Sequence, residues 1–126
     1  MQALRILLAE DEPVIAQYVR HLLEEKGHRV LQADESAELQ TLCDQFHPDI
    51  AILNFKLAKR TNGMALADLV HQKSNLLMLF LTGARSKDVQ DSEAYQSTFP
   101  VLYKPFTPIQ LLNAVLELSE RLDNGK

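Results

Sequence analysis

The chain has 126 residues, enough for one domain with a single buried core. Hydrophobic residues make up 46% and charged residues 24%, which excludes a disordered chain. The formal net charge of −4 argues against direct binding to nucleic acid, which needs a basic face, and no apolar run reaches the roughly 18 residues of a membrane span.

Short apolar runs alternate with helical patterns in the first half of the chain. In chain order they predict a strand over 4–9, a helix over 13–26, a strand over 28–33, a helix over 36–46 and a strand over 50–54. Pro13 suits the first position of a helix, and Gly27 suits the residue just beyond a helix end. The first half therefore predicts the pattern strand, helix, strand, helix, strand.

The second half continues the alternation. It predicts a helix over 64–73, a strand over 76–81, a helix over 86–96, a strand over 101–103 and a helix over 107–122. The helix over 86–96 has the fewest residues able to face a core. By contrast, Thr107, Pro108 and Gln110 form the pattern of a capping box, which predicts a well-defined start for the last helix.

The cysteine and the histidines indicate no metal site. The histidines are His21, His28, His47 and His71. They lack the spacing of metal ligands, so we expect ordinary side chains at the surface or at helix ends. The single cysteine, Cys43, falls on the apolar side of the second helix and forms no internal disulfide, so we expect a packed thiol in a reducing cytoplasm.

Strict alternation of strands and helices predicts a parallel sheet with helices on both faces. We therefore expect one α/β domain over 1–126 with a core over about 4–122. Its architecture is a doubly wound five-stranded parallel sheet with five helices, and no output domain is expected within this chain. In such sheets ligands bind beyond the carboxyl ends of the central strands, so residues that follow the apolar runs should converge.

Polar residues follow four of the five apolar runs. Glu10 and Asp11 follow the first run, Asn54 ends the third, Thr82 follows the fourth and Lys104 follows the fifth. Two adjacent carboxylates suit a cation such as Mg²⁺, because their charges repel when nothing lies between them. A hydroxyl and an ammonium that face the same point suit the oxygens of a phosphoryl group. A nucleophilic carboxylate would link metal and phosphoryl group, and the chain has an amide in that place.

Four segments resemble, in order and spacing, the signatures of the receiver domains of two-component response regulators. They are Ala9-Glu10-Asp11-Glu12-Pro13, Asp49-Ile-Ala-Ile-Leu-Asn54, Leu81-Thr82-Gly83-Ala84 and Tyr103-Lys104-Pro105-Phe106. Each signature is common by itself, but the ordered set is specific and spans residues 5–122. The resemblance implies a flavodoxin-like fold of the receiver type. It also implies a partner, either a histidine kinase or another signalling protein.

The resemblance also assigns roles to the polar residues at the strand ends. It implies that Glu10 and Asp11 bind Mg²⁺ together with the residue at position 54 and the backbone carbonyl of Lys56. It implies that Thr82 supplies a switch hydroxyl. In the same way, Lys104 is expected to contact the phosphoryl group.

Asn54 departs from this pattern, because it stands where receivers carry the aspartate that accepts phosphate. A carboxamide delocalises its nitrogen lone pair and carries no negative charge, so its oxygen is a poor nucleophile toward phosphorus. The loss of one negative charge should also weaken Mg²⁺ binding. It should further allow Lys104 to pair with Asp11 or Glu10.

Two hypotheses follow from Asn54. The chain is either a pseudo-receiver that signals by protein binding alone, with no enzyme activity, or an ordinary phosphoacceptor domain whose aspartate was replaced at position 54. Val101, in place of an aromatic residue, and Ala58, in place of a proline, are further departures that favour the pseudo-receiver. A flavin-binding carrier of the flavodoxin type shares the architecture. However, the acidic run Glu10-Asp11-Glu12 would repel its phosphate.

The last helix carries two apolar rows. One row is Ile109, Leu112, Leu116 and Ser119, and the other is Leu111, Val115, Leu118 and Leu122. We expect the first row to face the sheet, which leaves the second row as a surface for a homodimer or another partner.

Overall fold

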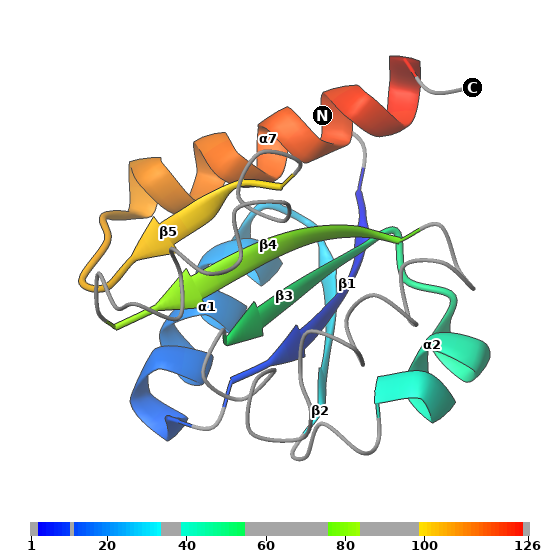
Figure 1. Cartoon of the computed structure of the whole chain (residues 1–126), viewed down its shortest axis with the longest axis horizontal. Helices are drawn as coiled ribbons and strands as arrows, with labels where there is room; N and C mark the ends of the chain where they lie inside the picture. Colours follow the sequence, from blue (N-terminus) through cyan, green and yellow to red (C-terminus); the bar gives the residue numbers. More distant parts are fainter. Residues whose placement is uncertain (1–2, 11, 34–38, 55–75, 84–98, 125–126) are drawn as a thin grey trace.

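The computed structural model describes residues 3–10, 12–33, 39–54, 76–83 and 99–124. Its strands are β1 (Arg5–Ala9), β2 (Arg29–Ala33), β3 (Ile50–Asn54), β4 (Leu77–Thr82) and β5 (Val101–Tyr103). They form one parallel sheet in the order β2-β1-β3-β4-β5 (Figure 1). The predicted five-stranded parallel sheet is confirmed, and every strand lies within one residue of its predicted bounds.

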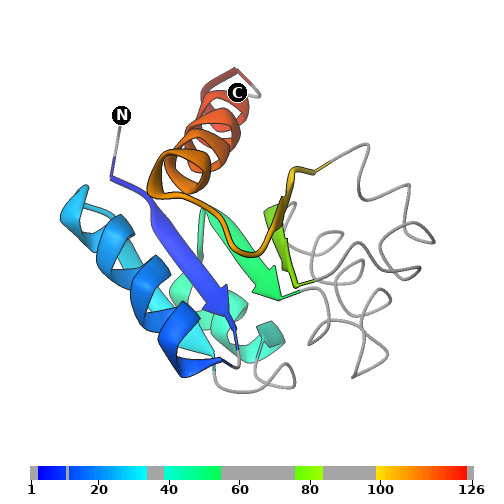
Figure 2. The ribbon, with the colours of Figure 1, turned by 90° about the vertical axis from the view of Figure 1, so that its left-hand side faces the viewer.

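Three helices lie in the described part of the chain. They are α1 (Pro13–Glu25), α2 (Leu39–Phe46) and α7 (Pro108–Asn124). α1 and α7 cover one face of the sheet, and α2 packs against the other face (Figure 2). The helices predicted over 64–73 and 86–96 lie outside the described residues, as do the first residues of the helix predicted over 36–46. None of the three described helices is both long enough and apolar enough to cross a membrane.

α1 ends in a Schellman motif, the hydrogen-bonded stop that a glycine makes possible. Gly27 has a positive φ of 90°, which its missing Cβ allows without a clash. The Gly27 N–H donates to the carbonyl of Glu24 at 3.0 Å, and the His28 N–H donates to the carbonyl of Leu23 at 3.1 Å. The predicted helix stop at Gly27 is confirmed.

α7 begins with the capping box that its sequence predicts. The Thr107 backbone N–H donates to Oε1 of Gln110 at 2.8 Å. In return, the Gln110 backbone N–H donates to Oγ1 of Thr107 at 3.2 Å. Both hydrogen bonds satisfy N–H groups that have no partner within the helix, so the start of α7 is fixed directly after the end of β5.

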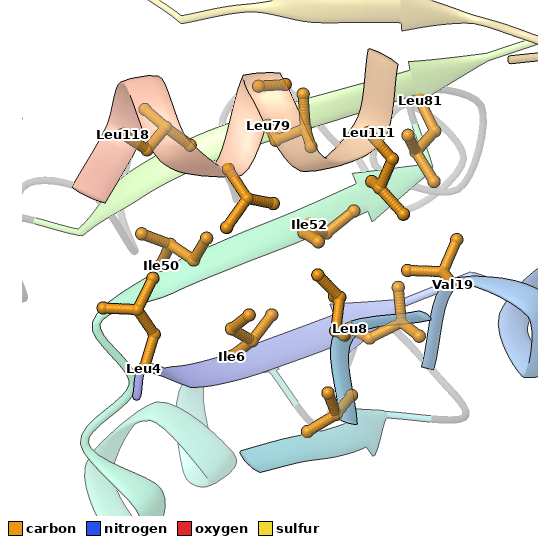
Figure 3. Close-up of a cluster of buried hydrophobic side chains, with 14 of the residues drawn as sticks. Leu4, Ile6, Leu8, Val19, Ile50, Ile52, Leu79, Leu81, Leu111 and Leu118 are labelled. Carbon is orange, nitrogen blue, oxygen red and sulfur yellow. The ribbon is translucent and has the colours of Figure 1, made fainter. Parts of the chain in front are cut away.

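The core has two halves, one on each face of the sheet, because successive side chains of a strand point to opposite faces. Toward α1 and α7 the strands contribute Ile6, Leu8, Ile50, Ile52, Leu79 and Leu81 (Figure 3). Toward α2 they contribute Leu7, Ala9, Ala51, Leu53, Met78 and Phe80. Cys43 of α2 packs into this second half with 4% of its surface exposed, which confirms the predicted packed thiol.

The prediction for the two rows of the last helix is wrong. Leu111, Val115 and Leu118 are fully buried, and Figure 3 shows Leu111 and Leu118 directed toward the sheet. The row expected to face the sheet instead leaves Ile109 69% and Leu116 39% exposed. Both rows have helical spacing, and the packing of α7 on the sheet decides which of them is buried. The row of Leu111, Val115, Leu118 and Leu122 is therefore core rather than a partner surface, with Leu122 half-buried at its end.

His28 differs from the expected surface or helix-end histidine, because it is only 4% exposed. Its Nδ1 accepts a hydrogen bond from the Leu4 backbone N–H at 3.0 Å, and its Nε2 has no partner within the described part of the chain. The turn after α1 brings this ring beneath the start of β1. His21 and His47 are exposed as expected, and His71 lies outside the described residues.

Candidate functional site

The carboxyl ends of the strands bring together the polar residues that follow them. The register pairs Ala9 with Leu53, Asn54 with Leu81 and Thr82 with Tyr103. Glu10 therefore comes level with Asn54, and Lys104 follows level with the end of β4. The Lys104 backbone N–H donates to the Thr82 carbonyl at 2.7 Å, which extends this alignment past β5. Glu10, Asn54, Thr82 and Lys104 thus share one edge of the sheet, as the alternation of elements predicts.

Asn54 and Glu10 are in direct contact across β3 and β1. Their residues are 4% and 2% exposed, and Nδ2 of Asn54 donates a hydrogen bond to Oε2 of Glu10. An ionised carboxylate only accepts hydrogen bonds, so the amide must turn its nitrogen rather than its oxygen toward Glu10. The buried carboxylate gains a donor in this way, as a buried charge requires.

Lys104 supplies the second donor to Glu10. Its Nζ lies 2.5 Å from Oε1 of Glu10 and 3.0 Å from Oε1 of Glu12. The predicted pairing of Lys104 with Glu10 is confirmed. The contact with Glu12 was not predicted, although Glu12 belongs to the same acidic run and this closeness in sequence was the one available signal.

The surroundings of Lys104 keep it charged. Burial by itself lowers the pKa of Lys104, but hydrogen bonds to Glu10 and Glu12 and the negative charges of both carboxylates outweigh burial and raise the pKa above its ordinary value. The side chain is 10% exposed and points into the edge of the sheet rather than into solvent. At neutral pH it is therefore an ammonium group held between two carboxylates.

The structure places only part of the predicted metal and phosphoryl set. Thr82 is buried at the end of β4, 6% exposed. Asp11 and Lys56 lie outside the described residues, so two of the four predicted metal ligands have no described position. Within residues 3–10, 12–33, 39–54, 76–83 and 99–124, no three acidic, histidine or cysteine side chains are grouped closely enough to hold a metal ion.

An aromatic contact lies beside this edge, between the first and last described helices. The rings of Tyr18 in α1 and Phe106, which follows β5, have centroids 6.0 Å apart, and their planes make an angle of 42°.

A surface depression of about 410 Å³ is lined by Val14, Gln17, Tyr18 and His21 on the outer side of α1. None of the predicted site residues lines this depression.

Comparison with known proteins agrees with this fold. The family model for the response regulator receiver domain matches residues 6–116. A crystal structure of a response regulator receiver domain protein from Clostridium thermocellum superposes with a TM-score of 0.83 at 26% identity, and the match covers 99% of this chain and all of that one.

Curated relatives are longer proteins. Aerobic respiration control protein ArcA of Escherichia coli (strain K12) is 28% identical over 125 residues, which cover 98% of this chain and 52% of that protein. Transcriptional regulatory protein PdtaR of Mycobacterium tuberculosis (strain ATCC 25618 / H37Rv) is 27% identical over 112 residues, which cover 88% of this chain and 54% of that protein. The chain thus spans about half the length of these two relatives.

Proposed function

Because the chain belongs to the family of response regulator receiver domains, we propose that it is a two-component signalling module with Asn54 at the phosphoacceptor position. It takes up no phosphoryl group there and has no enzyme activity of its own. It signals as a pseudo-receiver, by binding other proteins. The observation that carries this proposal is the hydrogen bond from the Asn54 amide to the buried carboxylate of Glu10.

The chemistry of Asn54 supports this proposal. Formation of an acyl phosphate needs a carboxylate oxygen as nucleophile, and the amide oxygen of Asn54 carries too little electron density for this attack. The amide is also oriented by its bond to Glu10. Lys104, which would contact phosphoryl oxygens in a working receiver, is already bonded to Glu10 and Glu12. Among the described residues, position 54 therefore offers no nucleophile, and the Lys104 ammonium group is already paired with two carboxylates.

A second candidate function is an ordinary phosphoacceptor domain whose aspartate was replaced at position 54. It is favoured by one observation: Glu10, Thr82 and Lys104 still share the carboxyl edge of the sheet. Such a site would need only a carboxylate at position 54 to regain a nucleophile. The two candidates therefore differ in what an Asn54→Asp variant can do.

The partner that fits this proposal is a histidine kinase or another signalling protein. The curated relatives carry names of regulatory and control proteins and are about twice as long as this chain. We propose that the module works in the cytoplasm, where the buried thiol of Cys43 stays reduced. Its net charge of −4 makes direct contact with nucleic acid by this domain unfavourable.

Phosphorylation of the wild-type chain and an Asn54→Asp variant tests the proposal. Both are incubated with radiolabelled acetyl phosphate and MgCl₂, and acyl phosphate is recognised by its release with hydroxylamine. We expect no label on the wild type and none on the variant. Label on the variant alone would support the second candidate, and label on the wild type would contradict both. Asn113→Asp, on the exposed side of α7, is the matched control for a new carboxylate.

A further inference from the structure

Lys104 lies where two chain segments and two carboxylates meet. Its Nζ contacts Oε1 of Glu10 at 2.5 Å and Oε1 of Glu12 at 3.0 Å. Glu10 follows β1, Glu12 is the residue that precedes α1, and Lys104 follows β5. One ammonium group therefore connects the β1–α1 junction with the chain that leads from β5 into α7.

We propose that the ammonium group of Lys104 replaces a divalent cation in this site, so that the domain excludes Mg²⁺ and holds its β5–α7 connection in place without any ligand. This inference rests on the proposed function and adds how the site is regulated. In an ordinary receiver, the arrangement of this region depends on a bound cation and a phosphoryl group. Here the counterion of Glu10 and Glu12 is the ammonium group of Lys104, which belongs to the chain itself.

The described residues do not fit a magnesium ion. Mg²⁺ requires oxygen ligands at about 2.0–2.1 Å in nearly octahedral geometry. One oxygen of Glu10 accepts a hydrogen bond from Lys104, and the other accepts one from Asn54. Asn54 presents its amide nitrogen, which is no metal ligand, toward this carboxylate. A cation would have to expel Lys104 and turn the amide of Asn54 before it could bind Glu10.

The two contacts of Lys104 contribute differently. Glu10 is fully buried at its side chain, so removal of Lys104 leaves a buried charge whose remaining hydrogen-bond donor among the described residues is Asn54. Glu12 is 60% exposed at its side chain, and water screens this pair, so its contribution is small. The contact with Glu10 therefore sets the position of Lys104, and Glu12 contacts the same ammonium group from the solvent side.

The contact has a consequence for the neighbouring surface. Phe106 follows two residues after Lys104 and packs beside Tyr18 of α1. The Lys104 backbone N–H is bonded to the Thr82 carbonyl. The side chain and the backbone of Lys104 are therefore both held in place. As a result, the surface around Phe106 keeps one arrangement whether or not cations are present. A partner of the pseudo-receiver would meet the same surface at all times.

The experiment measures cation binding directly. Binding of Mn²⁺, used as a spectroscopic substitute for Mg²⁺, is followed by electron paramagnetic resonance for the wild type, Lys104→Met and Lys104→Arg. We expect Lys104→Met to bind Mn²⁺ at least about tenfold more tightly than the wild type, because a repelling charge is gone and Glu10 is free. Lys104→Arg keeps the charge and should resemble the wild type. Lys26→Met, at an exposed lysine that ends α1, is the control for loss of one positive charge elsewhere.

Two outcomes would overturn the inference. One is Mn²⁺ binding by the wild type as tight as by Lys104→Met. The other is that Lys104→Met, shown to be folded by its circular dichroism, binds Mn²⁺ as weakly as the wild type does. If Lys104→Met does not fold, the wild type alone decides. Its thermal midpoint and the resonances of Phe106 must stay unchanged by MgCl₂ beyond the effect of NaCl at equal ionic strength.

Failure of this inference and failure of the proposed function are separable. A wild type that binds Mn²⁺ but takes no label from acetyl phosphate contradicts only the cation exclusion. A wild type that takes label contradicts the proposed function itself.

Discussion

Nδ2 of Asn54, at the end of β3, donates a hydrogen bond to Oε2 of Glu10, at the end of β1. Both residues are almost completely buried, so water does not share this contact. Neighbouring strands of a parallel sheet hold the two side chains level with each other, and among the described residues this bond and the one from Lys104 satisfy the Glu10 carboxylate. The identity of residue 54 therefore affects stability as well as phosphate chemistry.

Replacement of Asn54 by aspartate should destabilise the domain in the absence of divalent cations. The variant loses a donor and places a second negative charge against Glu10, which we expect to cost about 1–3 kcal/mol in the free energy of unfolding. MgCl₂ should recover part of this loss, because the added negative charge allows a cation to compete with Lys104 for the two carboxylates and to reduce their repulsion. Urea unfolding with EDTA and with MgCl₂ measures both effects. A variant as stable as the wild type in EDTA would show that the amide bond contributes nothing.

The capping box of α7 should contribute measurably to stability. Thr107→Ala removes the acceptor of the Gln110 backbone N–H, and we expect a loss of about 1 kcal/mol in the free energy of unfolding. Thr107→Ser keeps the hydroxyl and should retain most of that stability. Chemical denaturation of the three proteins gives the comparison. Equal losses for alanine and serine would mean that the methyl group, rather than the hydrogen bond, matters.

The two sides of α7 should respond differently to truncation. Leu118 is fully buried, so Leu118→Ala should lower stability by about 2–5 kcal/mol through lost burial and a cavity. Leu116 is 39% exposed on the same helix, and Leu116→Ala should cost clearly less. Because Leu118 and Leu116 are the same residue type on the same helix, the difference between the urea midpoints of the two variants measures the effect of burial. Comparable losses at both positions would contradict the orientation of α7.

His28 should make the domain less stable as the pH falls. Burial, and then the positive N-terminus, lower the pKa of His28 below its ordinary value of 6.5. The unfolded chain therefore binds more protons than the native one below 6.5, so the stability that neutral His28 provides is present above that value and is lost as the pH falls through the native pKa.

His28→Asn provides the test, because its amide oxygen can accept the Leu4 N–H in place of Nδ1 without titrating. The variant should show a flatter dependence of unfolding free energy on pH in the mildly acidic range. His21→Asn, at an exposed histidine, should leave the profile of the wild type unchanged. A wild-type profile that is already flat through this range would rule out His28 as the sensitive group.

Cys43 should be unreactive in the native protein. Burial, with a further contribution from the charge of Asp44, raises the pKa of Cys43 to about 11, so almost no reactive thiolate forms at neutral pH. A thiol reagent such as 5,5′-dithiobis(2-nitrobenzoate) should label it only as fast as the domain opens. Thr41→Cys, combined with Cys43→Ser, places a thiol on the exposed side of α2 and should react at once. Rapid labelling of native Cys43 would mean that α2 detaches easily from the sheet.

The amino-acid sequence by itself determined the order and type of the described elements and the edge at which the site forms. Continuous apolar runs such as residues 50–53 suit strands that are buried on both faces, and this needs no knowledge of distant contacts. The stop at Gly27 and the capping box of Thr107 are local for the same reason. Because all strands run parallel, residues that follow them meet at one edge, so the pairing of Lys104 with Glu10 could also be anticipated.

Only the tertiary structure decided which side of each element meets which neighbour. The spacing of Leu111 and Leu116 is equally helical, and the rotation of α7 on the sheet alone buries the first and exposes the second. The burial of His28 beneath Leu4 and the contact of Glu12 with Lys104 join residues 24 and 92 positions apart. Local sequence patterns describe the neighbours within one turn or one strand, whereas such contacts depend on the packing of whole elements, and that packing has no local signature.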